Sequence, residues 1–267
     1  MNKVDCVSEM EIVDAIEYFY KEFKIMDDFK PKEKTNRIFT ELVKYCIDND
    51  LDIPSDKEVL EKVKFINKCC AYWEYELEKY YANKIIHSKD PKKELEKFNY
   101  YENYEDLIKL EFKSISIYLN KIKKVLFVWW WPLSLSAIVL AKNYWIKSVV
   151  IDYDNEAVSL SKKVIDKIGL NNYIEVKKWN VENYVDSEEY SVCHISSFVF
   201  GATENKKVIE NLSKINFNLL LTRTSDKTRQ LLYKKTNESI LNKYFDVKFI
   251  AHPKNYVVNS IILSSKK

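Results

Sequence analysis

Two glutamates and a cluster of tyrosines have the residue types and spacing for acid–base chemistry. Glu74 and Glu78 are four residues apart in a segment with helical spacing of apolar residues, which places both carboxylates on one helix face. A Tyr-rich segment follows at residues 98–104. Carboxylates and tyrosines near a nucleotide site could deprotonate and orient an amine. The alternative is a solvated helix face beside packed aromatic rings, and these residues alone favour that alternative.

An acidic residue, Asp152, lies where nucleotide-binding units hold a ribose. Residues 124–154 predict a buried strand, a tight turn, an amphipathic helix and a second buried strand that ends in acidic residues. In such units an acidic residue about 20 positions after the turn binds ribose hydroxyls, and Asp152 has that spacing. The alternative is a solvated turn that caps a helix beginning near Glu156. Strand order and spacing favour the ribose interpretation.

The turn of this unit carries Trp129, Trp130 and Trp131, followed by Pro132. Nucleotide-binding turns use glycine there, because the backbone must approach the ligand closely. Three indoles would fill such a pocket, and an aromatic cluster of this kind is typical of a core or an interface. The chain of 267 residues has only 2 glycines, which fits the same departure.

Polar residues follow two further predicted strands. Asn180 comes after the third strand, where a polar residue often meets an adenine and where an ordinary loop is the equal alternative. Arg223 and Arg229 flank the end of the fifth strand. They could bind a substrate carboxylate through two parallel hydrogen bonds, and exposed surface arginines are the default alternative.

The bulk composition excludes several classes of function. With 43 basic and 40 acidic residues, the chain gives no reason to expect nucleic acid as a partner. No apolar run approaches the roughly 20 residues of a membrane span, and the acidic, amphipathic N-terminus is unlike a signal peptide. The 5 cysteines and 3 histidines lack metal-ligand spacing. We expect a cytoplasmic protein with free thiols, no membrane partner and no metal.

The chain divides near residue 120 into a helical N-terminal domain (residues 1–120) and a domain of alternating strands and helices (residues 121–267). The alternation predicts a mostly parallel sheet, whose last two strands form a hairpin. This is the Rossmann-like, seven-stranded layout of S-adenosylmethionine-dependent methyltransferases. The predicted strands are residues 125–129, 148–152, 173–178, 191–198, 217–222, 245–251 and 257–263. The predicted helices between them are residues 135–142, 156–168, 206–214 and 227–233.

Three segments within residues 77–233 resemble a known family. The first is the Tyr-rich run YYENYEDLIKLE at residues 100–111. The second is FVWWWPLSLS at residues 127–136, and the third is LTRT at residues 221–224, with Arg229 and Tyr233 beyond it. Together they resemble the nicotianamine synthases, and more narrowly the bacterial branch that makes staphylopine-type opine metallophores.

The resemblance implies an S-adenosylmethionine-dependent transferase. Such enzymes transfer the 3-amino-3-carboxypropyl (aminobutanoyl) group to an amine and release methylthioadenosine, with no metal required. The bacterial branch implies D-histidine as the acceptor and an opine dehydrogenase as the functional partner in metal acquisition. The number of transfers and the oligomeric state stay open, a homodimer being one alternative.

The resemblance also implies roles for residues on the acceptor side. Glu78 matches the glutamate that handles the acceptor amine, and Tyr104 matches the tyrosine that orients or deprotonates it. Glu74, Tyr101 and Arg223 are then expected to bind the amino-acid substrate, with Arg223 on its carboxylate.

On the cofactor side the resemblance implies that the turn residues Trp129, Trp131 and Pro132 bind S-adenosylmethionine. Asp152 matches the acid that binds its ribose, and Asn180 lies where the family often has an aspartate near the adenine.

Tryptophan stands where the family has glycine in the turn, and Trp145, Trp179 and Trp73 also fall on expected glycine positions. We hypothesise that this chain carries systematic glycine-to-tryptophan changes; real indoles in the turn predict weak or no cofactor binding. Two alternatives remain: a small-molecule methyltransferase on the same fold, and a non-catalytic Rossmann-like binding protein with a blocked turn.

Overall fold

The computed structural model describes residues 7–128, 131–197, 206–253 and 256–267. Within these ranges the chain forms a seven-stranded sheet in the order β3-β2-β1-β4-β5-β7-β6. The strands are β1 (Lys124–Val128), β2 (Lys147–Asp152), β3 (Ile174–Lys178), β4 (Tyr190–Ile195), β5 (Phe217–Thr224), β6 (Phe245–Ala251) and β7 (Ser260–Lys266).

The strand directions confirm the predicted fold class. Strands β1 to β5 pair in parallel, with Val125 of β1 opposite Ser148 of β2 and Val192 of β4. Strand β7 is inserted antiparallel between β5 and β6, which makes the predicted hairpin. The runs of β-branched and apolar residues are long enough only for short strands. Consecutive parallel strands also need a crossover segment to connect them.

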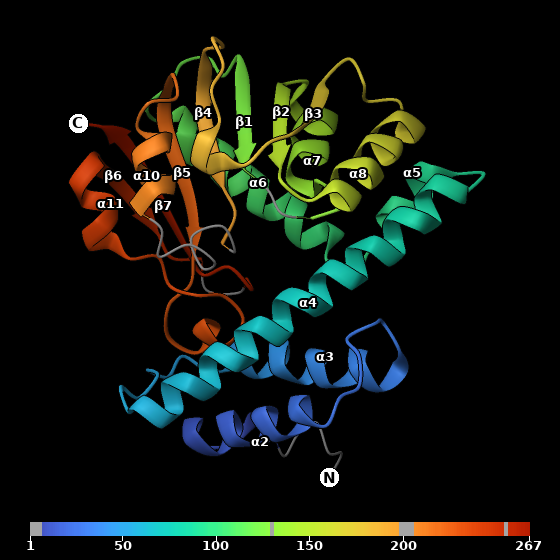
Figure 1. Ribbon diagram of the computed structural model, residues 1–267, viewed down its shortest axis with the longest axis vertical. Helices are drawn as coiled ribbons and strands as arrows, with labels where there is room; N and C mark the ends of the chain where they lie inside the picture. Colours follow the sequence, from blue (N-terminus) through green and yellow to red (C-terminus); the bar gives the residue numbers. More distant parts are fainter. Residues whose placement is uncertain (1–6, 129–130, 198–205, 254–255) are drawn as a thin grey trace.

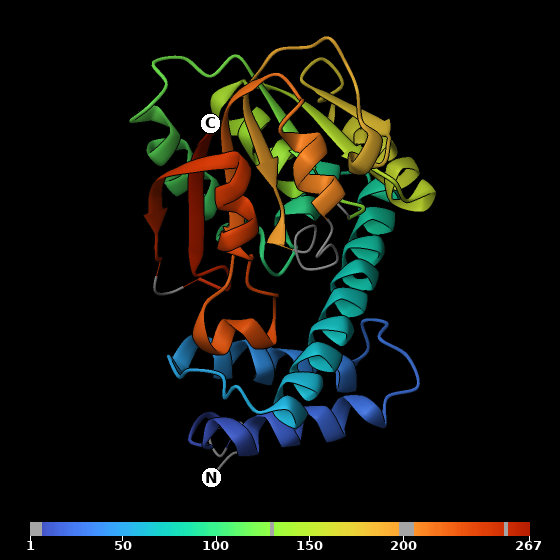
Figure 2. The same cartoon turned by 60° about the vertical axis from the view of Figure 1, so that its left-hand side comes forward.

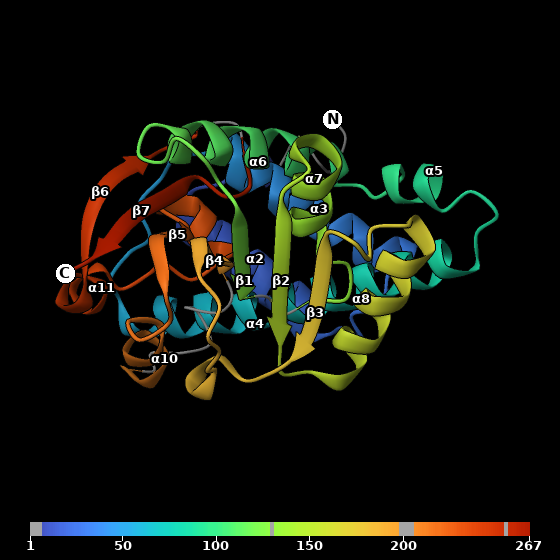
Figure 3. The same cartoon turned by 90° about the horizontal axis from the view of Figure 1, so that it is seen from above.

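The sheet has a hydrophobic core on each face, because side chains alternate along its strands. Val125 and Phe127 of β1 belong to one core, and Leu126 and Val128 belong to the other. Figure 3, which looks along the layers, shows α6 and α7 on one side of the sheet and α10 on the other. The helices of this part are α6 (Tyr101–Ser116), α7 (Leu135–Tyr144), α8 (Asn155–Ile168), α10 (Lys206–Leu212) and α11 (Glu238–Tyr244).

A single long helix, α4 (Lys57–His87), connects the N-terminal helices to the sheet (Figures 1 and 2). At about 1.5 Å per residue its 31 residues span about 46 Å. Asp56 begins it by accepting hydrogen bonds from the backbone N–H groups of Glu58 and Val59. Its first half packs with α2 (Ile12–Lys24) and lies beside α3 (Glu33–Asp48), and its second half reaches α8 and the short α5 (Pro91–Glu96).

Two contacts fasten α4 to the start of α8. The Tyr75 hydroxyl donates to Asp154 Oδ1 at 3.1 Å, and Lys79 pairs with Glu156 at 2.8 Å. Helix α6, in contrast, packs against α7 and contacts β7, and the rings of Phe112 on α6 and Tyr144 on α7 are stacked with centres 4.0 Å apart. The division of the chain near residue 120 stays a prediction.

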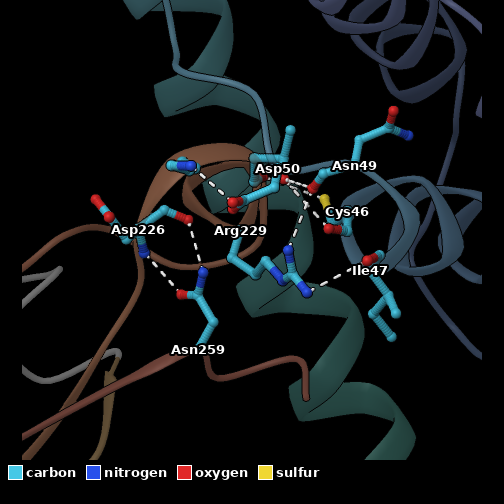
Figure 4. A network of polar contacts seen from close by, with 9 residues as sticks. Cys46, Ile47, Asn49, Asp50, Asp226, Arg229 and Asn259 are labelled. Carbon is cyan, nitrogen blue, oxygen red and sulfur yellow. Dashed lines mark hydrogen bonds and ion pairs between the residues drawn. The ribbon is translucent and has the colours of Figure 1, made fainter. Parts of the chain in front are cut away.

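The segment after β5 differs from the prediction of a regular helix at residues 227–233. It forms a 3₁₀ helix, η2 (Lys227–Leu231), that begins with Lys227 at φ 52°. Arg229 explains the difference: it donates to the carbonyls of Asn49 (3.2 Å) and Ile47 (3.3 Å), which the end of α3 leaves without helical partners (Figure 4). Tertiary contacts thus set this turn, and they also tie β5 to the N-terminal helices.

Helix α7 ends in a conformation that glycine favours. Trp145 closes the helix at φ 57° and ψ 29°, and its N–H bonds to the Ala141 carbonyl. This left-handed end is the usual place for glycine, because a side chain there clashes with the backbone. The Trp145 side chain is 67% exposed, so little burial compensates for the strain.

Candidate active site

A cavity lies where α4, α6 and the ends of β5 and β7 meet. Its empty volume, the opening to solvent included, is about 620 Å³. The polar side chains that line it are Glu74, Glu78, Tyr100, Asn103, Tyr104, Arg223, Tyr233 and Tyr256. The helix face predicted from the spacing of the two glutamates is therefore the wall of a pocket and not a solvated surface.

Glu78 lies between this cavity and the turn after β1. Its side chain is 3% exposed, and its Oε2 accepts a hydrogen bond from the backbone N–H of Leu133 at 2.9 Å. Burial raises the pKa of Glu78 well above its usual range; the Leu133 N–H lowers it in part, and the charges of Glu74 and Asp152 raise it further. A carboxylate in this setting is a stronger base than an ordinary glutamate.

Glu74 lies one helical turn before Glu78, and its side chain is partly exposed. Its Oε1 accepts a hydrogen bond from the Tyr233 hydroxyl at 2.7 Å. Burial raises the pKa of Glu74 to about 7, although the bond from Tyr233 acts in the opposite direction. Two carboxyl groups thus line one cavity, and both resist ionisation when no cation is present.

Tyr104 and Arg223 form the opposite wall. The Arg223 guanidinium carbon lies 5.5 Å from the centre of the Tyr104 ring. Burial and then the charge of Glu78 raise the pKa of Tyr104 well above its ordinary value, while Arg223 opposes the shift. Tyr104 therefore stays a hydroxyl that can donate a hydrogen bond.

A buried ion pair behind the cavity holds Arg223. Its Nε and Nη2 donate to the two carboxylate oxygens of Glu111 at 2.6 Å and 3.0 Å. His194 Nε2 lies 3.2 Å from Glu111 Oε2. Burial would raise the pKa of Glu111, but Arg223 and His194 outweigh it and hold the pKa at about 2. The expected carboxylate partner of Arg223 is thus already supplied by the protein.

Asp152 ends β2 and leaves one carboxylate oxygen without a partner in the described part of the chain. It is 3% exposed, and its Oδ1 accepts the backbone N–H of Asp154 at 2.8 Å. Its Oδ2 is buried and has no hydrogen-bond partner in the described part of the chain. Burial raises the pKa of Asp152 to about 7, against the Asp154 N–H. A ribose hydroxyl would satisfy this oxygen, so the site fits the predicted group.

The alternative to a ribose-binding role was a helix cap, and Asp154, not Asp152, makes that cap. Its Oδ1 accepts the backbone N–H of Ala157 at 2.7 Å and so begins α8. The helix cap therefore does not occupy Asp152, and the ribose role of Asp152 stays a prediction.

The turn after β1 is described only in part, because Trp129 and Trp130 lie outside the described residues. Trp131 is 6% exposed, and its ring centre lies 5.8 Å from that of Tyr75 on α4. Pro132 is also buried. Through Trp131 and Leu133 the turn is in direct contact with the helix that carries Glu74 and Glu78.

Two other predicted site residues lie apart from this centre. The Tyr101 hydroxyl accepts a bond from Lys142 at 2.6 Å, and Tyr101 does not line the cavity, whereas its neighbour Tyr100 does. Asn180 is exposed, and its side chain accepts the N–H of Glu182 in a short turn. This turn is beside Asp152, since the N–H of Trp179 bonds to the Asp152 carbonyl at 2.8 Å.

The sequence interpretation missed Tyr100, Asn103 and Glu111 as parts of the site, and it assigned no role to Tyr233 within it. All of them lie in the segments that carry the resemblance. The sequence therefore identified the segments, but it did not show which of their side chains belong to the site. In the ranges that the structure describes, no group of His, Cys, Asp and Glu could hold a metal ion. No helix in those ranges is long and apolar enough to cross a membrane.

Comparison with known proteins gives consistent matches over almost the whole chain. The family model described as "Nicotianamine synthase protein" matches residues 6–267. Nicotianamine synthase 2 of Arabidopsis thaliana is 29% identical over 268 residues, which covers 96% of this chain and 83% of that protein. Nicotianamine synthase of Solanum lycopersicum is 24% identical and covers 98% of this chain and 85% of that protein.

Solved structures establish the fold. MtNAS in complex with MTA and tNA superposes with a TM-score of 0.83 at 21% identity and covers 97% of this chain and 100% of its own. A glutamate-to-glutamine variant of MtNAS in complex with S-adenosylmethionine superposes with a TM-score of 0.81 at 22% identity, covering 97% and 99%.

Proposed function

The chain belongs to the nicotianamine synthase family, and from this premise we propose that it transfers the aminobutanoyl group of S-adenosylmethionine to an amine. The proposed acceptor is the amino group of D-histidine, and methylthioadenosine is the second product. An opine dehydrogenase would then convert the adduct into a staphylopine-type metallophore.

The contact between Glu78 and Leu133 is the observation that carries this proposal. It joins the turn of the nucleotide-binding unit to a buried carboxyl group in the wall of the cavity. If the turn holds the nucleotide and the cavity holds the amine, Glu78 would act as a base between them, which is the arrangement that group transfer to an amine needs.

Bound S-adenosylmethionine would supply a carbon made electrophilic by the neighbouring sulfonium. Asp152 Oδ2 would accept a ribose hydroxyl and so fix the donor against the turn. Glu78, with its raised pKa, would take the proton from the acceptor ammonium. The freed nitrogen lone pair forms the new C–N bond, and the electrons of the broken C–S bond stay on the sulfur of the leaving thioether.

Tyr104, Glu74 and Arg223 would position the acceptor. Tyr104 keeps its hydroxyl proton and can donate to the acceptor or to Glu78. Glu111 holds the Arg223 guanidinium beside the Tyr104 ring. The positive charge of Arg223 would offset part of the negative charge of Glu74 and Glu78 when these are ionised. Tyr101 and Asn180 retain their proposed binding roles only if a ligand rearranges their present contacts.

Product analysis after incubation with S-adenosylmethionine and D- or L-histidine tests the proposal. Methylthioadenosine with a histidine adduct heavier by one aminobutanoyl unit supports it. Glu78→Gln keeps the shape and removes the base, so we expect it to retain cofactor binding and lose at least roughly a hundredfold in rate. Formation of S-adenosylhomocysteine would instead support a methyltransferase.

The buried Trp131 is consistent with an alternative from another class of function, a binding protein that does not catalyse a reaction. If the turn that includes Trp129 and Trp130 fills the donor site, the protein is a Rossmann-like binding protein without catalysis. A stably folded protein that gives no heat with S-adenosylmethionine in calorimetry would favour this alternative.

A further inference from the structure

We infer that Glu74 and Tyr233 form a subsite for a second cationic nitrogen on the acceptor, one helical turn from the amine that Glu78 handles. The inference rests on the proposed function and narrows the acceptor to molecules with two basic nitrogens, such as basic or diamino amino acids.

The spacing of the two carboxyl groups supports a two-point site. Residues four apart on one helix face have Cβ atoms about 5–6 Å apart, and both Glu74 and Glu78 line the same cavity. A short diamine or a basic amino acid places its two nitrogens at a comparable separation. Each carboxyl group could then bind one nitrogen of the same molecule.

The hydrogen bonding of Glu74 leaves it able to accept a ligand. In the described part of the chain Tyr233 is its hydrogen-bond donor, through Oε1. Oε2 has no such partner there, and the side chain is partly exposed where it lines the cavity. Tyr233 also holds the carboxyl group in one orientation, which reduces the entropy that a ligand must remove on binding.

The charges around Glu74 favour a cation over an anion. The groups that face it are Cys70 and Glu78 from α4, Tyr100 and Tyr104 from α6, and Tyr233. Among the described residues that line the cavity, Arg223 is the one with a full positive charge, and Glu111 neutralises it. An acceptor with a second carboxylate would meet two glutamates, whereas a second cation would compensate them.

A purely structural role is the competing explanation. Glu74 would then only hold Tyr233 and so keep the loop after β5 in place. Such a role predicts that removing the charge affects every acceptor to the same degree, whereas a binding role predicts a change in preference between acceptors.

Binding calorimetry with matched acceptors separates the two explanations. The probes are D-histidine and D-2,4-diaminobutyrate, with D-norvaline as a neutral acceptor, each titrated into the full chain in the presence of methylthioadenosine, which has no aminobutanoyl group to transfer. For Glu74→Gln we expect the preference for the dibasic probes over D-norvaline to fall roughly tenfold or more, as for the loss of a charge-assisted hydrogen bond. Glu76→Gln, which makes the same change on α4 outside the cavity lining, should keep the preference.

Two further measurements complete the test. Binding of D-2,4-diaminobutyrate near pH 7, measured in buffers of different ionisation enthalpy, should release more protons from the wild-type protein than from Glu74→Gln. Tyr233→Phe should weaken the preference less than Glu74→Gln, because the carboxylate remains.

The inference is overturned if Glu74→Gln weakens all three probes equally, or if the wild-type protein shows no preference for the dibasic probes. The proposed function fails separately, if the dibasic probes bind preferentially and yet no methylthioadenosine forms with any acceptor.

Discussion

At the scale of single residues, Asp152 and Asp154 differ in the hydrogen bonds that their carboxylates accept. Asp152 is the last residue of β2, and Asp154 lies two residues further along, at the start of α8. Asp154 Oδ1 accepts hydrogen bonds from the N–H of Ala157 and from the Tyr75 hydroxyl, whereas Asp152 keeps Oδ2 buried without a partner in the described ranges. The ribose role of Asp152 stays a prediction from sequence spacing, and the unpartnered Oδ2 is consistent with it.

This difference predicts the effect of amide substitutions at the two positions. Asp152→Asn should weaken S-adenosylmethionine binding by roughly tenfold to a hundredfold, because an amide provides one acceptor oxygen fewer for the ribose. Asp154→Asn is the matched control, since asparagine also caps helices well. Calorimetric titration of both variants with S-adenosylmethionine checks this; equal affinities would contradict a ribose role for Asp152.

The raised pKa of Glu74 predicts a dependence of stability on pH. A carboxyl group with a pKa of about 7 in the folded protein, against 4.5 for the ordinary group, favours folding below pH 4.5. That contribution is lost as the pH rises through about 7, because the buried group must then ionise. Glu74→Gln cannot ionise, so its melting temperature should rise relative to the wild-type protein between pH 5 and pH 8.

Thermal melts of both proteins at pH 5 and pH 8 measure this difference. The melting temperature of Glu74→Gln should gain on that of the wild-type protein between pH 5 and pH 8. A gain of about 2–4 °C would correspond to about 1 kcal/mol of unfolding free energy in a chain of this size. A relative loss at pH 8 would mean that Glu74 is ionised and stabilising in the empty protein.

At the scale of elements, the end of α7 makes a clear prediction. Trp145→Gly should stabilise the protein by about 1 kcal/mol, because glycine adopts the left-handed conformation without a steric penalty. Trp145→Ala is the control: it removes the same indole and its contact with Tyr173, but keeps the Cβ atom. Urea unfolding of the two variants should show glycine as the more stable, and equal midpoints would refute the explanation.

Trp145 also bears on the hypothesis that tryptophan stands at glycine positions in this chain. Its backbone conformation is one that glycine favours, whereas Trp73 is buried and stacks on Phe39 at 4.4 Å. The turn at residues 129–131 is where the hypothesis matters for binding, and it stays a prediction. The intact mass of the protein purified from its natural source would test the hypothesis, because each replacement of glycine by tryptophan adds the same mass.

The elements that could be predicted from sequence are those set by local pattern. The parallel strands and the hairpin follow from the alternation of apolar, β-branched runs with helical segments along the chain. The turn at η2 could not be predicted, because its shape depends on carbonyls of α3 about 180 residues away in the chain. For the same reason Glu111 was seen in a motif but not as the partner of Arg223.

At the scale of the whole molecule, Arg229 joins the two halves of the structure. It is 3% exposed and binds the end of α3 from the loop that leads to Tyr233. Arg229→Met should lower the free energy of unfolding by about 2–3 kcal/mol, because a buried charge-assisted contact is lost and helix carbonyls lose their donor.

Lys227→Met is the matched control for this prediction. Lys227 lies two residues away and pairs with the exposed Asp50, so its loss should have an effect of less than about 1 kcal/mol. Denaturant unfolding of both variants checks the difference, and a larger loss for Lys227→Met would show that the buried contact is not the one that holds the halves together.

The long helix α4 has a consequence for how enzymes of this design can diversify. One unbroken element carries both carboxyl groups, contacts the nucleotide-side turn at Leu133 and is fastened to α8. An insertion or deletion in it would rotate every one of these groups away from its partner. New acceptors are therefore expected to evolve by exchanges on α6 and on the loop after β5, while the spacing within α4 stays constant among descendants.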